Sequence, residues 1–301
     1  MPLDVDSATD AITAGGVSMT TALITGCASG FGERAALVLA RKGLRVAAGV
    51  RDFGRAQGLV DAAAREKLPV ELVKLDVRSD ESVAAAVADV HARMGQIDIA
   101  INNAGLHLIA PAELCSIRDC QAILDTNVLG ALRVMQAVLP EMRRRRAGRI
   151  VIVTSAGSFV AVPHMAMYTA SKHALDALSA AMANEVKPFG IVITTVAPGT
   201  FHTAMAQKGL LPRETYDYSP YAAAQCPQHI KDIEEGPDPE PVADAIMRAA
   251  LDPDPPLRVL VGNGLDASLG PVVAMHDSFQ SWFAPREAGA APSSPLLKSA
   301  P

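Results

Sequence analysis

The segment Thr25-Gly26-Cys27-Ala28-Ser29-Gly30-Phe31-Gly32 decides the fold of this 301-residue chain. It follows a short run of apolar and β-branched residues, 21–25, and leads into residues 31–41, whose apolar positions have the period of a helix. The glycines let the backbone turn tightly and let a pyrophosphate approach the first turn of that helix. The spacing differs from the G-x-G-x-x-G dinucleotide fingerprint, and an ordinary glycine-rich turn is the alternative. Its place at the first strand-to-helix turn favours a nucleotide-binding unit.

The same alternation of strand and helix continues along the chain from this first unit. Apolar runs without polar alternation, separated by helices, are typical of a parallel sheet covered on both faces. The sequence therefore predicts an α/β fold with a doubly wound parallel sheet of about seven strands, whose ligand site lies at the carboxyl ends of the strands. The predicted strands are 21–25, 45–50, 70–75, 97–101, 149–154, 191–196 and 257–261, and the predicted helices are 31–41, 55–66, 81–93, 111–146, 167–187 and 240–251.

Three segments interrupt this alternation. Residues 200–238 hold four prolines and separate the sixth predicted strand from the helix before the seventh. A segment of this length inside a domain predicts a substrate loop or lid. Residues 1–18 and 285–301 predict a flexible N-terminal extension and a disordered C-terminal tail. We therefore expect a single Rossmann-type domain over residues 19–284.

Composition and charge exclude several classes of protein. Half of the residues are hydrophobic and 20% are charged, which predicts a large core rather than disorder. The net charge of −5 argues against a nucleic-acid partner, because nucleic acid binds basic surfaces. No run of ~18 apolar residues predicts a membrane span, and the first residues carry no secretory signal. The four cysteines lack disulfide or metal spacing, so we expect no metal site and a cytoplasmic location.

A second motif, Tyr168-Thr169-Ala170-Ser171-Lys172, opens a predicted helix. Residues four apart share one helix face at ~6 Å, so the phenol and the ammonium group can point into one pocket. A nearby cation favours the phenolate and lowers the pKa of a tyrosine toward neutrality, as a general acid or base requires. Ser155, at the end of the fifth predicted strand, is placed to donate a hydrogen bond to a substrate oxygen.

With Asn102-Asn103-Ala104-Gly105 after the fourth predicted strand, the chain resembles the single-domain branch of the short-chain dehydrogenase/reductase family. The resemblance covers roughly residues 20–262 and includes the glycine turn and the Tyr168/Lys172 pair. It also includes Asp76, Asn127, Ser155 and the segment Pro198-Gly199 followed by Thr203.

The resemblance implies a catalytic set of Asn127, Ser155, Tyr168 and Lys172. Tyr168 would exchange a proton with the carbonyl oxygen, and Ser155 would orient and polarise that carbonyl. Lys172 would lower the pKa of Tyr168 and hold the ribose hydroxyls of a nicotinamide cofactor. Asn127, inside the long predicted helix, would hold a water in a proton relay to Lys172. The alternatives are a surface or helix-capping Asn127 and a Ser155 bonded to backbone.

The resemblance also implies a dinucleotide site. Asp76 would contact the adenine, Asn102 the adenosine side and Thr203 the carboxamide of the nicotinamide. An alternative role for Asp76 is to cap the helix that follows it. The residues implied to bind the cofactor are Gly26, Ser29, Gly30, Phe31, Gly32, Arg51, Asp76, Val77, Asn103, Ala104, Gly105, Tyr168, Lys172, Pro198, Gly199 and Thr203.

The end of the second predicted strand bears on the form of the cofactor. Val50 stands where an acidic residue would bind the ribose 2′-hydroxyl of NAD, and Arg51 follows it. An arginine forms bidentate, charge-assisted contacts with a phosphate. We therefore predict NADP(H). The alternative is that Asp52 supplies the acid after a shift of two residues, which would favour NAD(H).

Aromatic and methionine side chains predict the substrate. Tyr216, Tyr218 and Tyr221 crowd into residues 200–238, and apolar residues lie on segments expected to face the same site. These apolar residues are Met165, Met167, Phe201, Met205, Leu210 and Leu211. Adaptable apolar side chains favour a bulky hydrophobic ketone, aldehyde or alcohol. The alternative is that the tyrosines only fasten the segment to the domain.

Taken together, these features predict an NADP(H)-dependent oxidoreductase that interconverts a carbonyl and an alcohol. The alternative is a non-catalytic NADP(H)-sensing protein on the same fold, because a fold does not fix a function. The resemblance further implies a homodimer or homotetramer assembled through the predicted helices 111–146 and 167–187.

Overall fold

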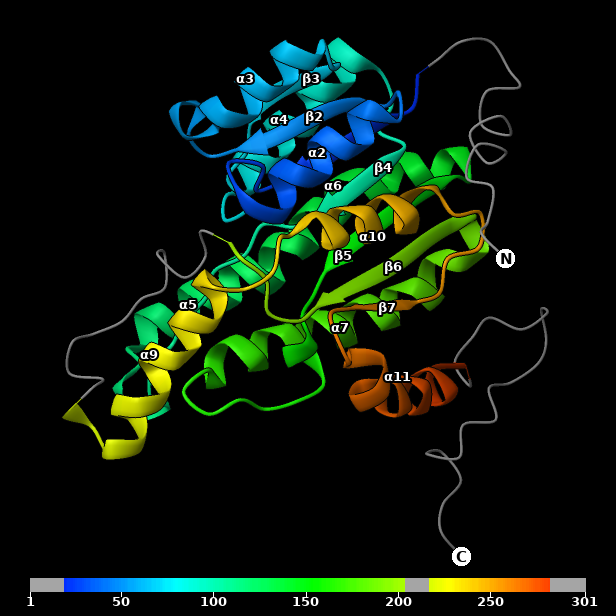
Figure 1. Cartoon of the computed structure of the whole chain (residues 1–301). Helices are drawn as coiled ribbons and strands as arrows, with labels where there is room; N and C mark the ends of the chain where they lie inside the picture. The colour runs from blue at the N-terminus through cyan, green and yellow to red at the C-terminus, as the bar shows by residue number, and fades with distance from the viewer. Residues whose placement is uncertain (1–18, 204–216, 282–301) are drawn as a thin grey trace, which may run out of the picture.

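The computed structural model describes residues 19–203 and 217–281. In this part of the chain, seven parallel strands form one sheet in the order β3-β2-β1-β4-β5-β6-β7 (Figure 1). The strands are β1 (Thr21–Thr25), β2 (Arg45–Val50), β3 (Val70–Lys74), β4 (Ile99–Asn102), β5 (Gly148–Val153), β6 (Ile191–Pro198) and β7 (Arg258–Val261). The predicted doubly wound parallel sheet is confirmed.

Helices cover both faces of this sheet (Figure 1). One face carries α2 (Gly30–Arg41), α3 (Gln57–Glu66) and α10 (Glu240–Leu251), and the other carries α4 (Asp80–Met94), α6 (Gly130–Arg145) and α7 (Ala166–Val186). Ala22 and Ile24 of β1 join the first core, whereas Leu23 joins the second, because successive side chains of a strand point to opposite faces. Helices bury both faces of the sheet, which explains the continuous apolar runs in the sequence.

β1 is the strand at which the chain reverses its direction across the sheet. It pairs with β2 on one side and with β4 on the other. The loops that follow β1 and β4 therefore leave the sheet over different faces, and a crevice opens between them. Ligands of open α/β sheets bind at this switch point.

The predicted helix over residues 111–146 is interrupted, which corrects the sequence-based expectation. The chain forms a short 3₁₀ turn, η2 (Ala112–Leu114), then α5 (Ile117–Leu124), a π-helical turn, η3 (Asp125–Leu129), and α6. Ser116 starts α5 because its hydroxyl accepts a hydrogen bond from the backbone N–H of Asp119, at 3.0 Å. The π turn contains Asn127, whose side chain is bound to another loop.

The helical stretch Ile117–Arg145 is long and apolar enough to cross a membrane by length and composition alone. Of its most apolar window, 44% is buried inside the protein. Val134, Met135 and Val138 of α6 are part of the core beneath the sheet. Packing against the sheet therefore accounts for the apolar character of this stretch. The expectation of no membrane partner stays a prediction.

Two helices in the described part of the chain were not predicted, α9 (Pro220–Glu234) and α11 (Leu265–Ser281). α9 lies within residues 200–238, so part of the expected loop is helical. The hydroxyl of Ser219 accepts a hydrogen bond from the backbone N–H of Ala222, and Pro220 occupies the first turn, where its missing N–H costs nothing. The predictions for residues 1–18, Met205, Leu210, Leu211, Tyr216 and the C-terminal tail lie outside the described residues.

α11 packs on α7, as its place beside that helix in Figure 1 indicates. The Gln280 amide donates to the carbonyl of Ala180 at 2.9 Å. Beneath it, the buried Arg258 guanidinium of β7 pairs with Asp176 of α7 at 2.7 Å and with Asp277 of α11. This cluster joins the last strand and the last helix to the core.

Candidate active site

A cavity of about 760 Å³ opens at the carboxyl ends of the strands. All of the predicted catalytic and cofactor-binding residues line it except Gly32, Asn102 and Asn127. The structure thus brings together residues from the ends of β1, β2, β4, β5 and β6 and from α7. Within residues 19–203 and 217–281, no group of three or more His, Cys, Asp or Glu side chains could hold a metal ion.

The glycine turn forms one end of this cavity. Gly26 has a φ of +76°, and a Cβ atom at this residue would lie 2.9 Å from the Cα atom of Ala104. A Cβ atom at Gly32 would overlap the side-chain amide of Asn103. Gly32 does not line the cavity. Because it has no side chain, it lets the start of α2 pack closely against the loop after β4.

Thr25 and Asn103 lock this turn to the loop after β4. The Thr25 hydroxyl accepts hydrogen bonds from the backbone N–H groups of Asn103 and Ala104, each at 3.0 Å. The Asn103 amide donates to the carbonyl oxygens of Thr25, at 2.9 Å, and Gly26, at 3.2 Å. Asn103 thus positions the backbone that lines the cavity.

The structure does not support the predicted adenosine contact of Asn102. Asn102 is the last residue of β4 and is absent from the cavity wall. Its side chain is buried, and neither atom of its amide has a hydrogen-bond partner in the described part of the chain. Because side chains alternate along a strand, the neighbouring Asn103 is the residue that reaches the turn.

The ends of β2 and β3 form the charged end of the cavity. Arg51, Arg55 and Arg78 line it together with two acids, Asp52 and Asp76. Asp76 pairs with Arg78 at 3.0 Å, and hydrogen bonds from this arginine lower the pKa of the carboxyl group. Asp52 accepts a hydrogen bond from the backbone N–H of Gly54 at 3.0 Å, as the N-cap of a short turn.

Arg55 and Arg78 of this charged end were not predicted from the sequence. Arg55 follows Arg51 by four residues just past the end of a strand, and this spacing was the available signal for it. Arg78 follows Asp76 by two residues and reaches the cavity because it folds back on that carboxylate.

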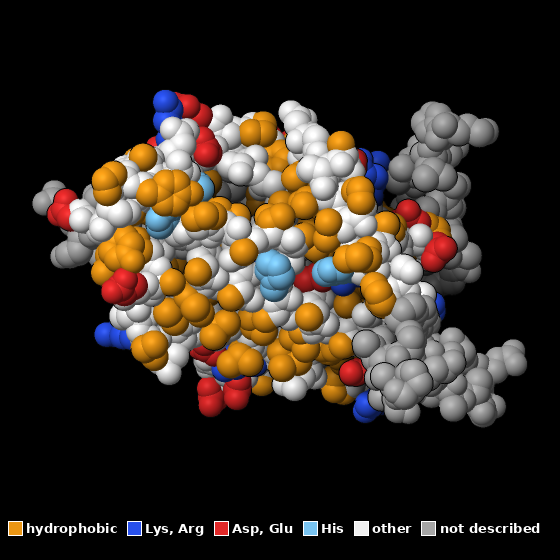
Figure 2. Space-filling view, turned by 90° about the horizontal axis from the view of Figure 1, so that it is seen from below, with side chains coloured by type: hydrophobic (Ala, Val, Ile, Leu, Met, Phe, Trp, Pro, Cys, Tyr) orange, Lys and Arg blue, Asp and Glu red, His pale blue; other side chains and the backbone are white. Residues whose placement is uncertain are grey.

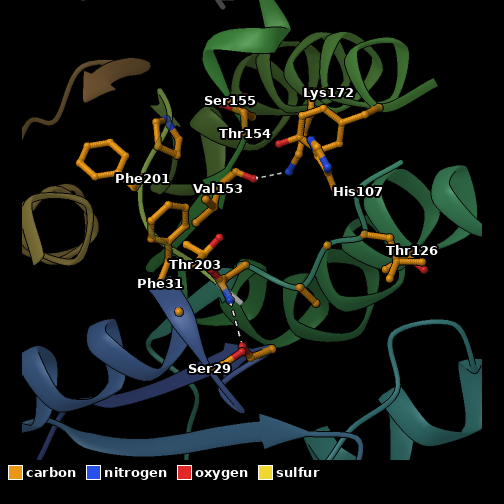
Figure 3. A pocket seen from close by; sticks show the side chains of 18 of the residues that line it. Ser29, Phe31, His107, Thr126, Val153, Thr154, Ser155, Lys172, Phe201 and Thr203 are labelled. Atoms are coloured by element: carbon orange, nitrogen blue, oxygen red, sulfur yellow. Dashed lines mark hydrogen bonds between the residues drawn. The ribbon is translucent and has the colours of Figure 1, made fainter. Parts of the chain in front are cut away.

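The opposite end of the cavity holds Tyr168 and Lys172 from α7 and Ser155 from the end of β5. Tyr168 and Lys172 are 8% and 4% exposed. Figure 3 shows Lys172 pointing into the cavity, where its Nζ atom donates to the carbonyl oxygen of Val153 at 3.0 Å. The same Nζ atom lies 5.8 Å from the centre of the Tyr168 ring.

Burial governs the proton affinities of this pair. Desolvation lowers the pKa of Lys172 to about 8. Desolvation also raises the pKa of Tyr168, and the hydrogen bond with Ser155 offsets this only in part. The expected lowering of the Tyr168 pKa by Lys172 is therefore wrong for the protein alone, because loss of water around the phenol outweighs it.

Ser155 has its hydroxyl oriented by backbone. The N–H of Gly157 donates to the Ser155 oxygen at 3.0 Å. This contact uses a lone pair and leaves the hydroxyl proton for the Tyr168 oxygen or for an oxygen placed beside it. Two hydroxyl donors thus converge on one point of the cavity, which is the arrangement that polarises a carbonyl group.

Asn127 acts on the loop after β4 rather than on the cavity. It is 1% exposed, and its Oδ1 atom accepts a hydrogen bond from the backbone N–H of Leu106 at 2.7 Å. Its Nδ2 atom donates to the carbonyl of Leu106 at 3.0 Å and to the hydroxyl of Ser171 at 2.9 Å. Both amide hydrogens are used, so the expected relay water would have to donate to an oxygen atom of Asn127, and this role stays a prediction.

The segment after β6 closes over the glycine turn. Pro198, Gly199 and Thr203 line the cavity, and a Cβ atom at Gly30 would lie 3.7 Å from the side chain of Thr203. The ring of Phe201 packs edge-on against that of Phe31, with 6.1 Å between ring centres. The start of α2 and the segment after β6, which both belong to the predicted cofactor site, are thereby in contact.

Of the predicted substrate residues that the structure describes, two line the cavity and three do not. Met165 and Phe201 do. Met167 packs instead against the cluster of Leu108, Ala110 and Ile123. Tyr218 and Tyr221 are about half exposed and are absent from the cavity wall. The Tyr218 hydroxyl donates to the carboxylate of Glu113 at 2.6 Å, and the Tyr221 ring packs against His164. These tyrosines therefore fasten α9 to the domain, which corrects the prediction that they line the pocket.

The sequence analysis also missed His107 and His229 in the cavity wall. His107 follows Asn102-Asn103-Ala104-Gly105 by two residues, and its place just past a central strand was the available signal. Its ring lies 4.3 Å from the ring of Tyr168, centre to centre, at an angle of 66°. His229 comes from α9, which was not predicted.

Comparisons with known proteins agree with this geometry. The short chain dehydrogenase family matches residues 20–212. 17-beta-hydroxysteroid dehydrogenase type 1 of Mus musculus is 36% identical, over 81% of this chain and 74% of that protein. Retinol dehydrogenase 8 of Homo sapiens is also 36% identical, over 79% of this chain and 80% of that protein.

Solved structures are similar as well. A short-chain dehydrogenase from Streptomyces avermitilis superposes with a TM-score of 0.75 at 30% identity, over 89% of this chain and 97% of that one. A variant of actinorhodin polyketide ketoreductase with NADPH superposes with a TM-score of 0.71 at 29% identity, over 82% of this chain and 97% of that one.

Proposed function

The chain belongs to the short-chain dehydrogenase/reductase family, and from that premise we propose that it is an NADP(H)-dependent oxidoreductase for bulky hydrophobic carbonyls and alcohols. Membership makes it an oxidoreductase that acts on alcohol or carbonyl groups with a nicotinamide cofactor. The observation that carries the proposal is the convergence of Ser155, Tyr168 and Lys172 on one end of a cavity whose other end is a glycine turn.

The residues present fit a dinucleotide. The turn at Gly26 and Gly30 lets a pyrophosphate approach the start of α2, where the backbone N–H groups and the helix dipole favour negative charge. The adenosine would lie along Asp76 and Val77, and the nicotinamide between Tyr168 and the Pro198–Thr203 segment. When bound, this cofactor supplies or accepts the hydride.

The chain's own residues then handle the proton. Tyr168 donates its phenolic proton to the carbonyl oxygen during reduction and takes it back during oxidation. Ser155 donates a second hydrogen bond to the same oxygen, because Gly157 already fills one of its lone pairs. Lys172 holds positive charge beside the phenol and favours its ionised form after the transfer.

The charges at the end of β2 favour NADP(H). Arg51, Arg55 and Arg78 surround the place where a 2′-phosphate would lie. Asp52, the acid of the alternative reading, already accepts a hydrogen bond from Gly54 and lies 3.9 Å from the side chain of Arg55. A neutral hydroxyl would gain less from three cations than a phosphate does. The similar ketoreductase structure with NADPH also supports this choice.

The substrate wall favours a bulky hydrophobic compound. Val160, Val162, Met165 and Phe201 contribute apolar surface to the cavity. The similar proteins named as hydroxysteroid and retinol dehydrogenases support a substrate of this kind.

We also propose a homodimer or homotetramer in the cytoplasm. The lower face of the molecule, which includes α11, presents many hydrophobic side chains (Figure 2). Met275 and Phe279 of α11, and Ile117 of α5, are large hydrophobic residues with about half or more of their surface exposed. Exposed apolar patches mark interaction sites. Light scattering during size-exclusion chromatography tests this, and a monomer at micromolar concentration would contradict it.

The experiment that tests the activity is NADPH oxidation across a panel of hydrophobic ketones and aldehydes, with wild type and Tyr168→Phe. General acid catalysis contributes about 10²–10⁴ in rate, so we expect the variant to lose at least about a hundredfold. NADPH binding, measured separately by fluorescence titration, should change little. If both proteins bind NADPH and neither reduces any carbonyl, the proposal fails.

A further inference from the structure

His107 is a buried polar residue that the mechanism above does not use. It lies in the loop after β4, is 4% exposed and lines the cavity beside Tyr168. Figure 3 shows His107 at the same end of the cavity as Lys172. Its Nδ1 atom is buried and has no hydrogen-bond partner among the described residues.

This arrangement is costly unless a ligand completes it. Most buried polar atoms in proteins are hydrogen-bonded, and leaving one unpaired destabilises the folded protein. An apolar side chain would fill the same space against the Tyr168 ring without that cost. Unlike His164, whose Nδ1 atom is also unpaired, His107 lines the cavity, where its imidazole ring can meet a polar group of a ligand.

The imidazole is neutral under physiological conditions. The pKa of His107 is lowered to about 4, chiefly by burial and also by the neighbouring His229 and Lys172. A neutral imidazole carries one donor and one acceptor, so it can bind a hydroxyl or a carbonyl oxygen. It has no charge with which to attract an anion.

We propose that His107 binds a second oxygen of the substrate, one that does not react and that lies next to the reactive carbonyl. This inference rests on the proposed function and names its substrate class. The Tyr168 phenol marks the position of the reactive oxygen, and the two rings are 4.3 Å apart. Because the two rings are neighbours, the two oxygens that they bind belong to nearby carbons of one substrate. The substrates are thus hydroxyketones or diketones with an apolar body.

A purely structural role for His107 makes a different prediction. If the imidazole only held the Tyr168 ring in place, its loss would lower kcat equally for every ketone. If it binds a second oxygen, the loss falls on substrates that carry that oxygen and acts mainly on kcat/KM. A matched pair of ketones separates these two effects.

The experiment compares benzoin with deoxybenzoin, which share a diphenyl skeleton and a ketone but differ by one hydroxyl on the neighbouring carbon. The ratio of kcat/KM for the two compounds is measured for wild type and for His107→Phe, which keeps an aromatic ring against Tyr168. We expect the variant to lower this ratio about tenfold, the worth of one hydrogen bond. Because each ratio is compared between proteins, the intrinsic reactivity of the two ketones cancels.

Two further variants complete the design. His107→Gln retains a hydrogen-bonding group and should restore part of the ratio, and it replaces the phenylalanine variant if that protein does not fold. His164→Asn is the matched control, because His164 also has an unpaired Nδ1 atom but does not line the cavity. Asparagine tolerates the φ of +61° found there, and the wild-type ratio should persist.

The outcomes are distinguishable. An equal loss of kcat on both ketones in His107→Phe, or a wild-type ratio that the substitution leaves unchanged, overturns the inference and leaves the proposed function standing. If wild type reduces neither of these ketones nor any other in the wider panel, the proposed function and the inference fall together.

Discussion

Backbone bounds the cavity where the cofactor is proposed to lie, whereas side chains from distant parts of the chain bound it where the substrate is proposed to lie. At the first end, Gly26 and Ala104 approach so closely that no Cβ atom fits between them. At the second end, His107 from the loop after β4 meets Tyr168 of α7. The first end should tolerate no change of backbone shape, and the second should respond to the chemistry of single side chains.

The largest expected effect tests the backbone end. Gly26→Ala places a Cβ atom against the Ala104 backbone at a residue with positive φ. The turn must shift, and a displacement of ~1 Å at a site that positions reactants costs about a hundredfold in rate. We expect that loss in NADPH-dependent turnover, measured beside thermal stability.

Gly43→Ala is the control for this prediction. Gly43 also has a positive φ, +87°, but a Cβ atom there would meet no atom within 4 Å. It should lose stability of about 1 kcal/mol, as an alanine at positive φ does, and keep its turnover. Equal losses of turnover in both variants would show that strain, rather than close approach to the cavity, is responsible.

A smaller effect is expected at the charged end. Arg51→Ala removes a cation that faces the proposed 2′-phosphate, and a charge-assisted hydrogen bond is worth about 1.5–3 kcal/mol. The KM for NADPH should rise about tenfold or more, while the KM for NADH changes little. A wild-type KM for NADH well below that for NADPH would contradict the choice of cofactor and favour the Asp52 alternative.

The substrate end should affect stability through His107. Its pKa is lowered from 6.5 to about 4 in the folded protein, so the unfolded chain takes up a proton first as the pH falls. The free energy of unfolding should therefore decline between about pH 6.5 and pH 4, by about 1 kcal/mol per pH unit, and His107 should contribute nothing above that range.

Urea unfolding of wild type and His107→Phe over this pH range measures that contribution. The facing groups, His229, Lys172 and Tyr168, are present in both proteins, so the difference between the two curves isolates the imidazole. Parallel curves would mean that His107 is not held in its neutral form.

The smallest effect is expected at the contact just before α9, where Tyr218 binds Glu113. Tyr218→Phe removes one exposed hydrogen bond to Glu113, which is worth less than about 1 kcal/mol, and should leave KM for the ketone nearly unchanged. A tenfold change in KM would contradict this expectation. It would support the sequence-based prediction that Tyr218 lines the substrate pocket.

The same contrast explains how much the sequence could predict. The glycine turn, the Arg51 position and the Tyr168/Lys172 pair are read from local spacing, because a strand, a turn and a helix fix their own geometry. The doubly wound parallel sheet likewise follows from alternation of element types. These features were predicted, and the structure brings the residues to one cavity.

Features that depend on tertiary contacts were not predicted. The pKa of Tyr168 follows from burial, which spacing does not report. The roles of Asn102 and Asn103 depend on which of two adjacent side chains faces the turn. α9 was hidden by Pro227 within it, although Ser219 and Pro220 carry the signals of a helix start. His107 acquires its surroundings only when the loop after β4 meets α7.

The most direct test of the account is transfer of deuterium from NADPH labelled at the nicotinamide C4 position to a hydrophobic ketone. Mass spectrometry of the alcohol from wild type should find the label on the carbinol carbon, and Tyr168→Phe should form almost no labelled alcohol while binding NADPH normally. Labelled alcohol from the variant at the wild-type rate, or none from wild type with any ketone in the panel, would contradict the account.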